Sequence, residues 1–87
     1  MSVTGNQIKA GRILAELEQV DLADAAEVSV NTIRNMEARG SEVVRVRLDT
    51  VIRVGNALRR HGVILMDDGD RTDGGVGVRL RDRADED

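Results

Sequence analysis

The stretch QVDLADAAEVSVNTIRNME, residues 19–37, decides the fold of this chain. Its first part is rich in alanine, a strong helix former, and predicts a short helix over 19–27. Ser29 interrupts that pattern and is a natural N-cap for a further helix over 30–38, after which Gly40 supplies a left-handed stop. The stretch therefore predicts two short helices joined by a tight turn. In the second helix three apolar residues form one stripe, of which the last two are expected in the core and the first either in the core or on a contact surface: Val30, Ile33 and Met36.

The residues on either side extend this helical pattern. Thr4 and Gln7 have the spacing of a capping box, and apolar residues follow at helical intervals, so we expect a helix over about 5–17. Residues 41–47 alternate valine and arginine at their end, which is compatible with a short strand. Because this segment lies between two predicted helices, we favour a loop that carries two arginines over a strand.

A further helix is expected after this loop. Leu48 and Asp49 have the pattern of an apolar residue followed by an Asp N-cap, and the helix is expected to end at His61 and Gly62. His61 is expected to satisfy carbonyl groups at this helix end rather than to act in catalysis. The apolar stripe of the helix is formed by Val51, Val54, Ala57 and Leu58.

The periodicity changes beyond Gly62. Two runs rich in β-branched residues, 63–66 and 76–80, flank the glycine-rich segment 67–75, and together they predict a two-stranded hairpin. An isolated hairpin is marginal in water, so this one must pack on the helices or on another subunit. The intervening aspartates resemble a calcium loop but lack a following bidentate glutamate, so no metal site is expected at Asp67, Asp68, Asp70 and Asp73.

Length and composition describe one small domain without covalent or metal cross-links. The 87 residues include no cysteine and one histidine, which excludes a disulfide framework and a thiol nucleophile and makes a metal or other cofactor unexpected. No aromatic residue is present, so the core must be aliphatic and thin, and a partner subunit would help to stabilise it. We expect a mainly α, four-to-five-helix domain over 1–62, a β-hairpin extension over 63–80 that mediates dimerisation, and a charged tail over 81–87.

The sequence contains no segment typical of a membrane protein or a secreted protein. No apolar run approaches the ~20 residues that span a bilayer, and the first residues lack the apolar stretch of a signal peptide. A cytoplasmic protein without a membrane partner is therefore expected.

The net charge of −3 hides a basic region. Residues 28–60 carry seven arginines and three acidic groups, a balance of +4, whereas residues 63–87 carry four basic and eight acidic groups. The basic charge is thus concentrated around the predicted second short helix and the segment after it. Such a distribution is typical of a nucleic-acid-binding surface.

The chain resembles the XRE family of phage repressor and Cro-like regulators. The resemblance rests on Gln19 at the start of the first short helix, on the pairs Leu22-Ala23, Val28-Ser29, Thr32-Ile33 and Met36-Glu37, and on the stretch 48–58, which is similar to the helix that follows the recognition helix in that family. It covers about residues 4–62, and the hairpin resembles an extension of some short members. The resemblance implies a compact repressor-like helix-turn-helix domain whose second helix enters the major groove of DNA.

The resemblance also implies which residues contact double-stranded DNA. Asparagine can pair with adenine, arginine with guanine, and valine can touch a thymine methyl group, so base contacts are expected from Val30, Asn31, Arg34 and Asn35. Contacts to the sugar and phosphate backbone are expected from Gln19, Ser29, Thr32, Arg39, Arg45 and Arg47. The expected protein is a repressor or autoregulator that binds an inverted repeat as a homodimer through Val63, Leu65, Val76, Val78 and Leu80. Small regulators of this kind, found in phages, plasmids and other mobile genetic elements, respond to their own concentration, and no small-molecule ligand is expected.

Two residues depart from the pattern of that family. Glu27 stands where a glycine is usual, so it must adopt a left-handed backbone conformation at a cost on the order of 1 kcal/mol. Glu18 stands where serine or threonine is usual, and its carboxylate repels phosphate while it favours the positive end of the helix dipole.

Two alternatives to DNA binding remain open at this point. The arginines at 34, 39, 45 and 47 can form a solvated face paired with Glu37 and Glu42. The acidic run 16–27 instead favours a protein-binding module, such as an antitoxin or an antiactivator. An enzyme is not expected, because the sequence offers no acid–base pair, phosphate loop or activated nucleophile.

Overall fold

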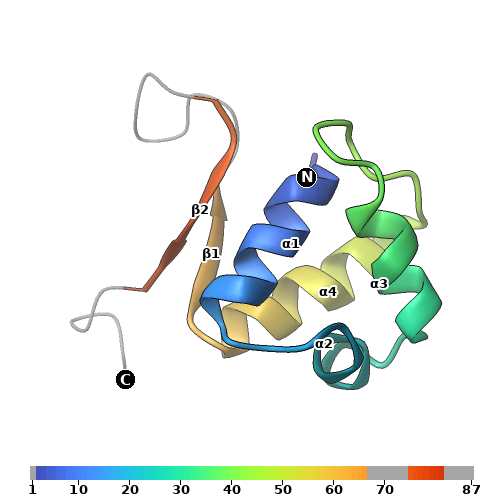
Figure 1. Ribbon diagram of the computed structural model, residues 1–87, viewed down its shortest axis with the longest axis horizontal. Coiled ribbons are helices and arrows are strands. Elements are labelled where there is room, and N and C mark those ends of the chain that lie inside the picture. Colours follow the sequence, from blue (N-terminus) through green and yellow to red (C-terminus); the bar gives the residue numbers. More distant parts are fainter. Residues whose placement is uncertain (1, 67–74, 82–87) are drawn as a thin grey trace.

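The computed structural model describes residues 2–66 and 75–81. In these ranges α1 lies between the hairpin on one side and α3 on the other (Figure 1). The prediction of a mainly α fold with a C-terminal hairpin is confirmed. Of the predicted tail over 81–87, residues 82–87 fall outside the described residues, as do the four aspartates of the predicted hairpin turn. The elements are α1 (Gly5–Leu14), α2 (Gln19–Ala26), α3 (Val30–Glu37), α4 (Leu48–Arg60), β1 (Val63–Met66) and β2 (Gly77–Leu80).

The N-terminal cap of α1 is the predicted capping box. The Gln7 backbone N–H donates to Thr4 Oγ1 over 3.1 Å, and the Thr4 N–H donates to Gln7 Oε1 over 2.9 Å. The C-terminus lies three residues before the predicted one. Glu16 adopts a φ of 59°, and the Leu17 N–H bonds back to the Arg12 carbonyl over 3.0 Å, which ends the helix.

The turn between α2 and α3 spans residues 27–29. Glu27 has a φ of 58°, as predicted, and the Val28 N–H donates to the Ala23 carbonyl over 3.0 Å. Ser29 Oγ accepts from the Thr32 N–H over 3.1 Å, so the predicted N-cap of α3 is also confirmed. The left-handed turn at Glu27 and the N-cap at Ser29 thus fix the path of the chain from α2 into α3.

The predicted start of α4 is wrong by two residues. Arg47 is the N-cap and Leu48 is the first helical residue, whereas Asp49 lies in the first turn, where its Oδ1 accepts from the Thr50 N–H over 3.0 Å. The predicted end is confirmed, with His61 as the C-cap and a φ of 86° at Gly62. The segment between α3 and α4 is a loop as favoured, apart from a single bridge that joins Thr4 to Val43.

The hairpin is antiparallel and pairs Val63 with Leu80 and Leu65 with Val78. Facing residues point to the same side of a hairpin, and here that side faces the helices. Val63 is buried, and Leu65 and Val78 pack against the core. Val63 is thus covered by the protein's own helices, whereas Leu65 and Val78 are half-buried, and the predicted dimer surface stays a prediction. Of the predicted set, Val76 and Leu80 remain exposed.

The core is aliphatic and draws on every helix. The largest side chains that are fully buried include Ile8 of α1, Leu22 of α2, Ile33 and Met36 of α3, and Leu58 of α4. The expectation that Ile33 and Met36 lie in the core is confirmed. None of the helices within the described ranges has the length and hydrophobicity that crossing a membrane requires.

Candidate nucleic-acid interface

The C-terminal end of α3 is fixed to the N-terminus of α1 by backbone contacts. The Gly5 N–H donates to the Glu42 carbonyl over 3.2 Å, and the Asn6 N–H donates to the Gly40 carbonyl over 2.8 Å. A Cβ atom on Gly5 would lie 2.5 Å from the Met36 carbonyl oxygen and 2.7 Å from the Gly40 nitrogen. Only glycine permits this approach, which sequence analysis did not reveal.

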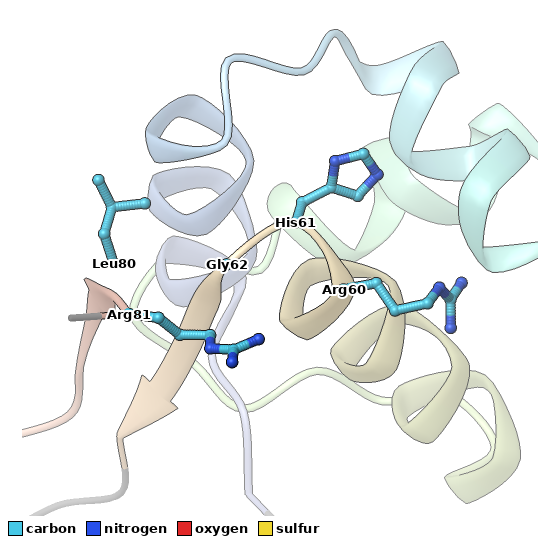
Figure 2. A pocket seen from close by; sticks show the side chains of 5 residues that line it. All are labelled: Arg60, His61, Gly62, Leu80 and Arg81. Atoms are coloured by element: carbon cyan, nitrogen blue, oxygen red, sulfur yellow. The ribbon is translucent and has the colours of Figure 1, made fainter. Parts of the chain in front are cut away.

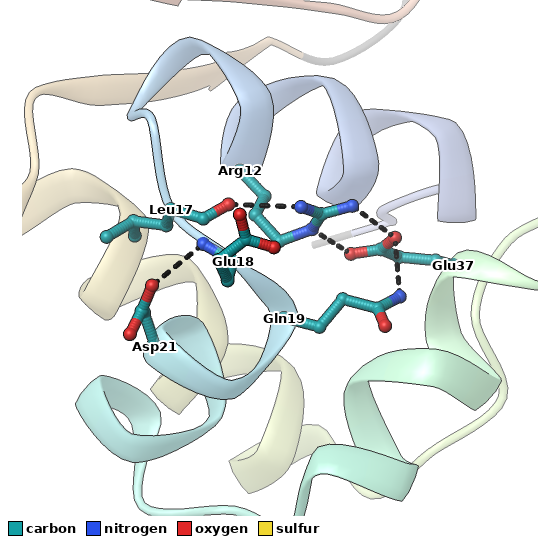
Figure 3. Close-up of polar contacts among 6 residues, drawn as sticks. All are labelled: Arg12, Leu17, Glu18, Gln19, Asp21 and Glu37. Carbon is teal, nitrogen blue, oxygen red and sulfur yellow. Dashed lines mark hydrogen bonds and ion pairs between the residues drawn. The ribbon is translucent and has the colours of Figure 1, made fainter.

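A polar network fixes the same end of α3 from another side (Figure 3). Arg12 Nε lies 2.7 Å from Glu37 Oε2, and Arg12 Nη2 donates to Glu37 Oε1 over 3.1 Å, so the pair is bidentate. The Gln19 amide also donates to Glu37 Oε1 over 3.1 Å. The hydrogen bond to the Glu37 carboxylate raises the pKa of Arg12 above its ordinary value, against the opposing effect of burial. This network joins α1, α2 and α3 through one carboxylate.

The opposite side of α3 carries polar side chains without partners. Asn31, Arg34 and Asn35 are exposed, and none of their side chains forms a hydrogen bond or ion pair with the residues that the structure describes. Their spacing of three and four residues places them on one face of the helix. Val30, the fourth predicted base contact, is half-buried and packs against the core. The structure thus brings three predicted residues together on an open face and turns the fourth partly inward.

The predicted backbone-contacting residues near the start of α2 and α3 already have partners inside the protein. The Ser29 and Thr32 hydroxyl groups lie 2.9 Å apart and bond to each other. Gln19 gives one amide hydrogen to Glu37 and retains a second one. Gln19 and one of the two hydroxyl groups can still donate to a phosphate oxygen, but the network around Glu37 restricts the orientation of the Gln19 side chain.

The three arginines after α3 differ in their pairing. Arg39 forms an ion pair with Glu42 at 2.7 Å, and Arg47 forms one with Asp49 at 3.2 Å. Arg45 is exposed and has no ionic partner in residues 2–66 and 75–81. The alternative prediction, that arginines of this region pair with Glu37 and Glu42, is therefore confirmed for Glu42. It is wrong for Glu37, which binds Arg12 instead.

Two arginines of α4 hold the C-terminal end of α2. Arg60 Nη2 donates to the Ala25 carbonyl over 2.8 Å, and Arg53 Nη1 donates to the Glu27 carbonyl over 3.4 Å. Both cations lie at the negative end of the α2 dipole, which they stabilise. This pair has no local sequence pattern, because each arginine and its carbonyl are 26 and 35 residues apart in the chain, respectively for Arg53 and Arg60.

A second basic region lies where α4 meets the hairpin, apart from the exposed side of α3 (Figure 2). Arg60, His61 and Arg81 line a hollow there together with Gly62 and Leu80. The His61 backbone N–H donates to the Leu58 carbonyl over 3.0 Å, so His61 lies at the helix end as predicted. Arg60 is already engaged with α2 through the Ala25 carbonyl.

The chain matches no protein-family model, and no curated protein matches it.

Proposed function

We propose that this protein is a sequence-specific regulator that binds double-stranded DNA, with α2 and α3 acting as a helix-turn-helix and α3 entering the major groove. One observation carries the proposal: Asn31, Arg34 and Asn35 share an open face of a helix whose other face is fixed. A rigidly held helix suits the reading of bases, because its backbone loses little conformational entropy on binding.

The chemistry of this face fits base recognition. A helix with its side chains is about 10–12 Å wide and matches the major groove of about 12 Å. Arg34 can donate two hydrogen bonds to guanine, and either asparagine can exchange two with adenine. Arg45, which has no ionic partner in the part of the chain described, suits a phosphate contact that sets the register of α3 on the duplex.

A regulator of this size gains affinity by pairing. The eight residues of α3 span about 12 Å and reach few base pairs. Two copies related by a two-fold axis would read two half-sites about 34 Å apart on an inverted repeat. We therefore propose a repressor or autoregulator that acts as a homodimer.

The test is a titration of the purified protein with DNA from upstream of its own gene, at several salt concentrations and against competitor DNA. We expect saturable binding that resists competitor. Arg34→Ala or Asn35→Ala should weaken specific binding by about 1–3 kcal/mol and relax the base preference. Arg45→Ala should weaken binding to all sequences and reduce the salt slope by about 1. Uniform weakening by Arg34→Ala would contradict base reading by α3.

A second candidate function is a protein-binding module such as an antitoxin or an antiactivator. One observation favours it: the five acidic residues of the run 16–27 are all exposed, and their charges repel DNA. A folded protein that shifts no DNA at low salt, and that co-purifies with a partner protein in stoichiometric amount, would support this function over DNA binding. The acidic residues are Glu16, Glu18, Asp21, Asp24 and Glu27.

A further inference from the structure

The helix α4 carries a second apolar stripe, apart from the one that it buries in the core. Leu48 and Ile52 are 62% and 46% exposed, although both are large aliphatic side chains. Gly55 and Arg59 continue their line at the spacing i, i+4, i+7 and i+11, which keeps residues on one side of a helix. The stripe therefore runs along most of α4, a helix of 13 residues or about 20 Å.

A hollow lies beside this stripe, between α4 and β1. Gly55 forms part of its wall and leaves room because it has no side chain. Ile52 stands at its edge, and Ile64 and Leu65 of β1 supply further apolar wall. Asn56 and Arg59 complete the wall, so the same surface presents an exposed isoleucine and a largely apolar hollow next to it.

This combination is self-complementary about a two-fold axis. A two-fold axis that passes beside this stripe, perpendicular to α4 and level with residues 53 and 54, would place a second α4 antiparallel to the first. Ile52 would then face the partner's Gly55 and enter the hollow beside it. Leu48 would face the aliphatic stem of the partner's Arg59. Interfaces between identical subunits most often have this symmetry, in which one patch meets its own copy.

The charges on α4 agree with the antiparallel arrangement. The first turn carries Asp49, and the last turn carries Arg59 and Arg60. Arg59 has no ionic partner among the described residues, so its guanidinium is available to the partner's Asp49. The ion pair between Asp49 and Arg47 competes little with this contact. The side chains of Asp49 and Arg47 are 55% and 86% exposed, and ion pairs that are so exposed contribute little to stability.

We propose that the exposed stripe of α4, formed by Leu48, Ile52, Gly55 and Arg59, together with the hollow at Ile64 binds a second copy of this chain through an antiparallel α4 pair. The assignment does not depend on DNA binding, since it rests on the shape and charge of α4 alone. Other large apolar side chains are also exposed, among them Ile13 and Leu14 on α1 and Leu80 on β2, but no comparable placement of opposite charges in the described part of the chain argues for a second copy there.

The first test is the molar mass of the full chain by light scattering or sedimentation over a range of concentrations. We expect a dimer, and we expect Ile52→Glu to raise the dissociation constant at least about tenfold, because it buries a charge in an apolar hollow. The matched control is Ile13→Glu, which places the same charge at an isoleucine that is 57% exposed on α1. It should leave the dimer intact, and far-UV circular dichroism should show that both variants are folded.

A charge exchange tests the antiparallel geometry. Asp49→Lys and Arg59→Glu should each weaken the dimer, and the double variant should recover most of the lost affinity, since the pair would then form with reversed signs. The proposal is overturned if the wild-type chain stays monomeric at the highest concentration reached. It is equally overturned if Ile13→Glu dissociates the dimer while Ile52→Glu does not, or if the double variant is no tighter than the single ones.

Discussion

The two sides of α1 are held in different ways. Toward α3, α1 is joined by backbone hydrogen bonds at Gly5 and Asn6 and by the bidentate pair of Arg12 and Glu37. Toward the hairpin, apolar packing is supplemented by Gln7, whose amide donates to the Met66 and Gly77 carbonyls over 2.8 and 3.0 Å. The side with the closest backbone contact and the ion pair is the one that positions Asn31, Arg34 and Asn35. The candidate interface is therefore built on the more tightly constrained side of α1.

Among variants that test the two sides of α1 separately, Gly5→Ala is expected to have the largest effect on stability. The new methyl group would lie within 2.5–2.9 Å of three backbone atoms of the α3 end, which cannot rotate away as a side chain could. We expect a loss of about 3 kcal/mol or more in the free energy of unfolding, measured in urea. Gly77→Ala on β2 is the control, because nothing lies within 4 Å of its added Cβ. Equal stability of the two variants would contradict a tight contact on the α3 side.

Removal of the Arg12 side chain should have the next largest effect. Arg12→Met leaves the Glu37 carboxylate, whose side chain is only 6% exposed, without its cation. We expect a loss of about 2–3 kcal/mol, and a smaller loss in Arg12→Met/Glu37→Met than the sum of the single losses. The corresponding loss in Arg39→Met should stay below about 1 kcal/mol, since the Arg39–Glu42 pair is exposed. Strict additivity would show that the buried pair does not couple α1 to α3.

Gln7→Glu tests the hairpin side separately. The carboxylate still accepts from the Thr4 N–H, but it offers no donor to the Met66 and Gly77 carbonyls. We expect a loss of about 2 kcal/mol and faster amide hydrogen exchange in β2, with exchange in α3 changed less. Asn6→Asp makes the same chemical change at an exposed residue of the first turn of α1 and should be neutral or slightly stabilising. Equal acceleration of exchange in β2 and α3 would show that the two sides are not distinct.

The smallest effect is expected at the turn into α3. Glu27→Gly removes a non-glycine residue from a φ of 58° and should raise the free energy of unfolding by about 0.5–1 kcal/mol. Asp24→Gly, one turn earlier inside α2, should instead lower it by about 0.3 kcal/mol, the difference in helix propensity between aspartate and glycine. Thermal unfolding of both variants provides the measurement, and a destabilised Glu27→Gly would refute strain at this turn.

Local signals predicted most of the fold. Helix caps at Thr4 and Ser29, the turn at Glu27 and the glycine after α4 are decided by neighbouring residues, and these predictions are confirmed. The end of α1 was missed because glutamate, unlike glycine, does not signal the left-handed conformation that Glu16 adopts.

Long-range pairing limited what could be predicted about the candidate site. The polar face of α3 follows from helical spacing, whereas the pairing of Arg12 with Glu37 joins residues 25 positions apart and has no local pattern. For a related reason, the side of the hairpin that packs on the helices was not predicted. The run from 63 to 66 is apolar throughout, so its alternation cannot show which side packs on the helices.

The central claim, that the exposed side of α3 reads DNA sequence, is tested most directly by selecting bound sequences from random duplex DNA. The selection should be run with the wild-type chain, with Arg34→Ala, and with Arg79→Ala, which removes the same charge from the hairpin on the other side of α1 (Figure 1). We predict that the wild type and Arg79→Ala enrich the same motif, and that Arg34→Ala loses the preference at one position in each half-site. Enrichment of the same motif by all three proteins, or of none by the wild type, would contradict the account.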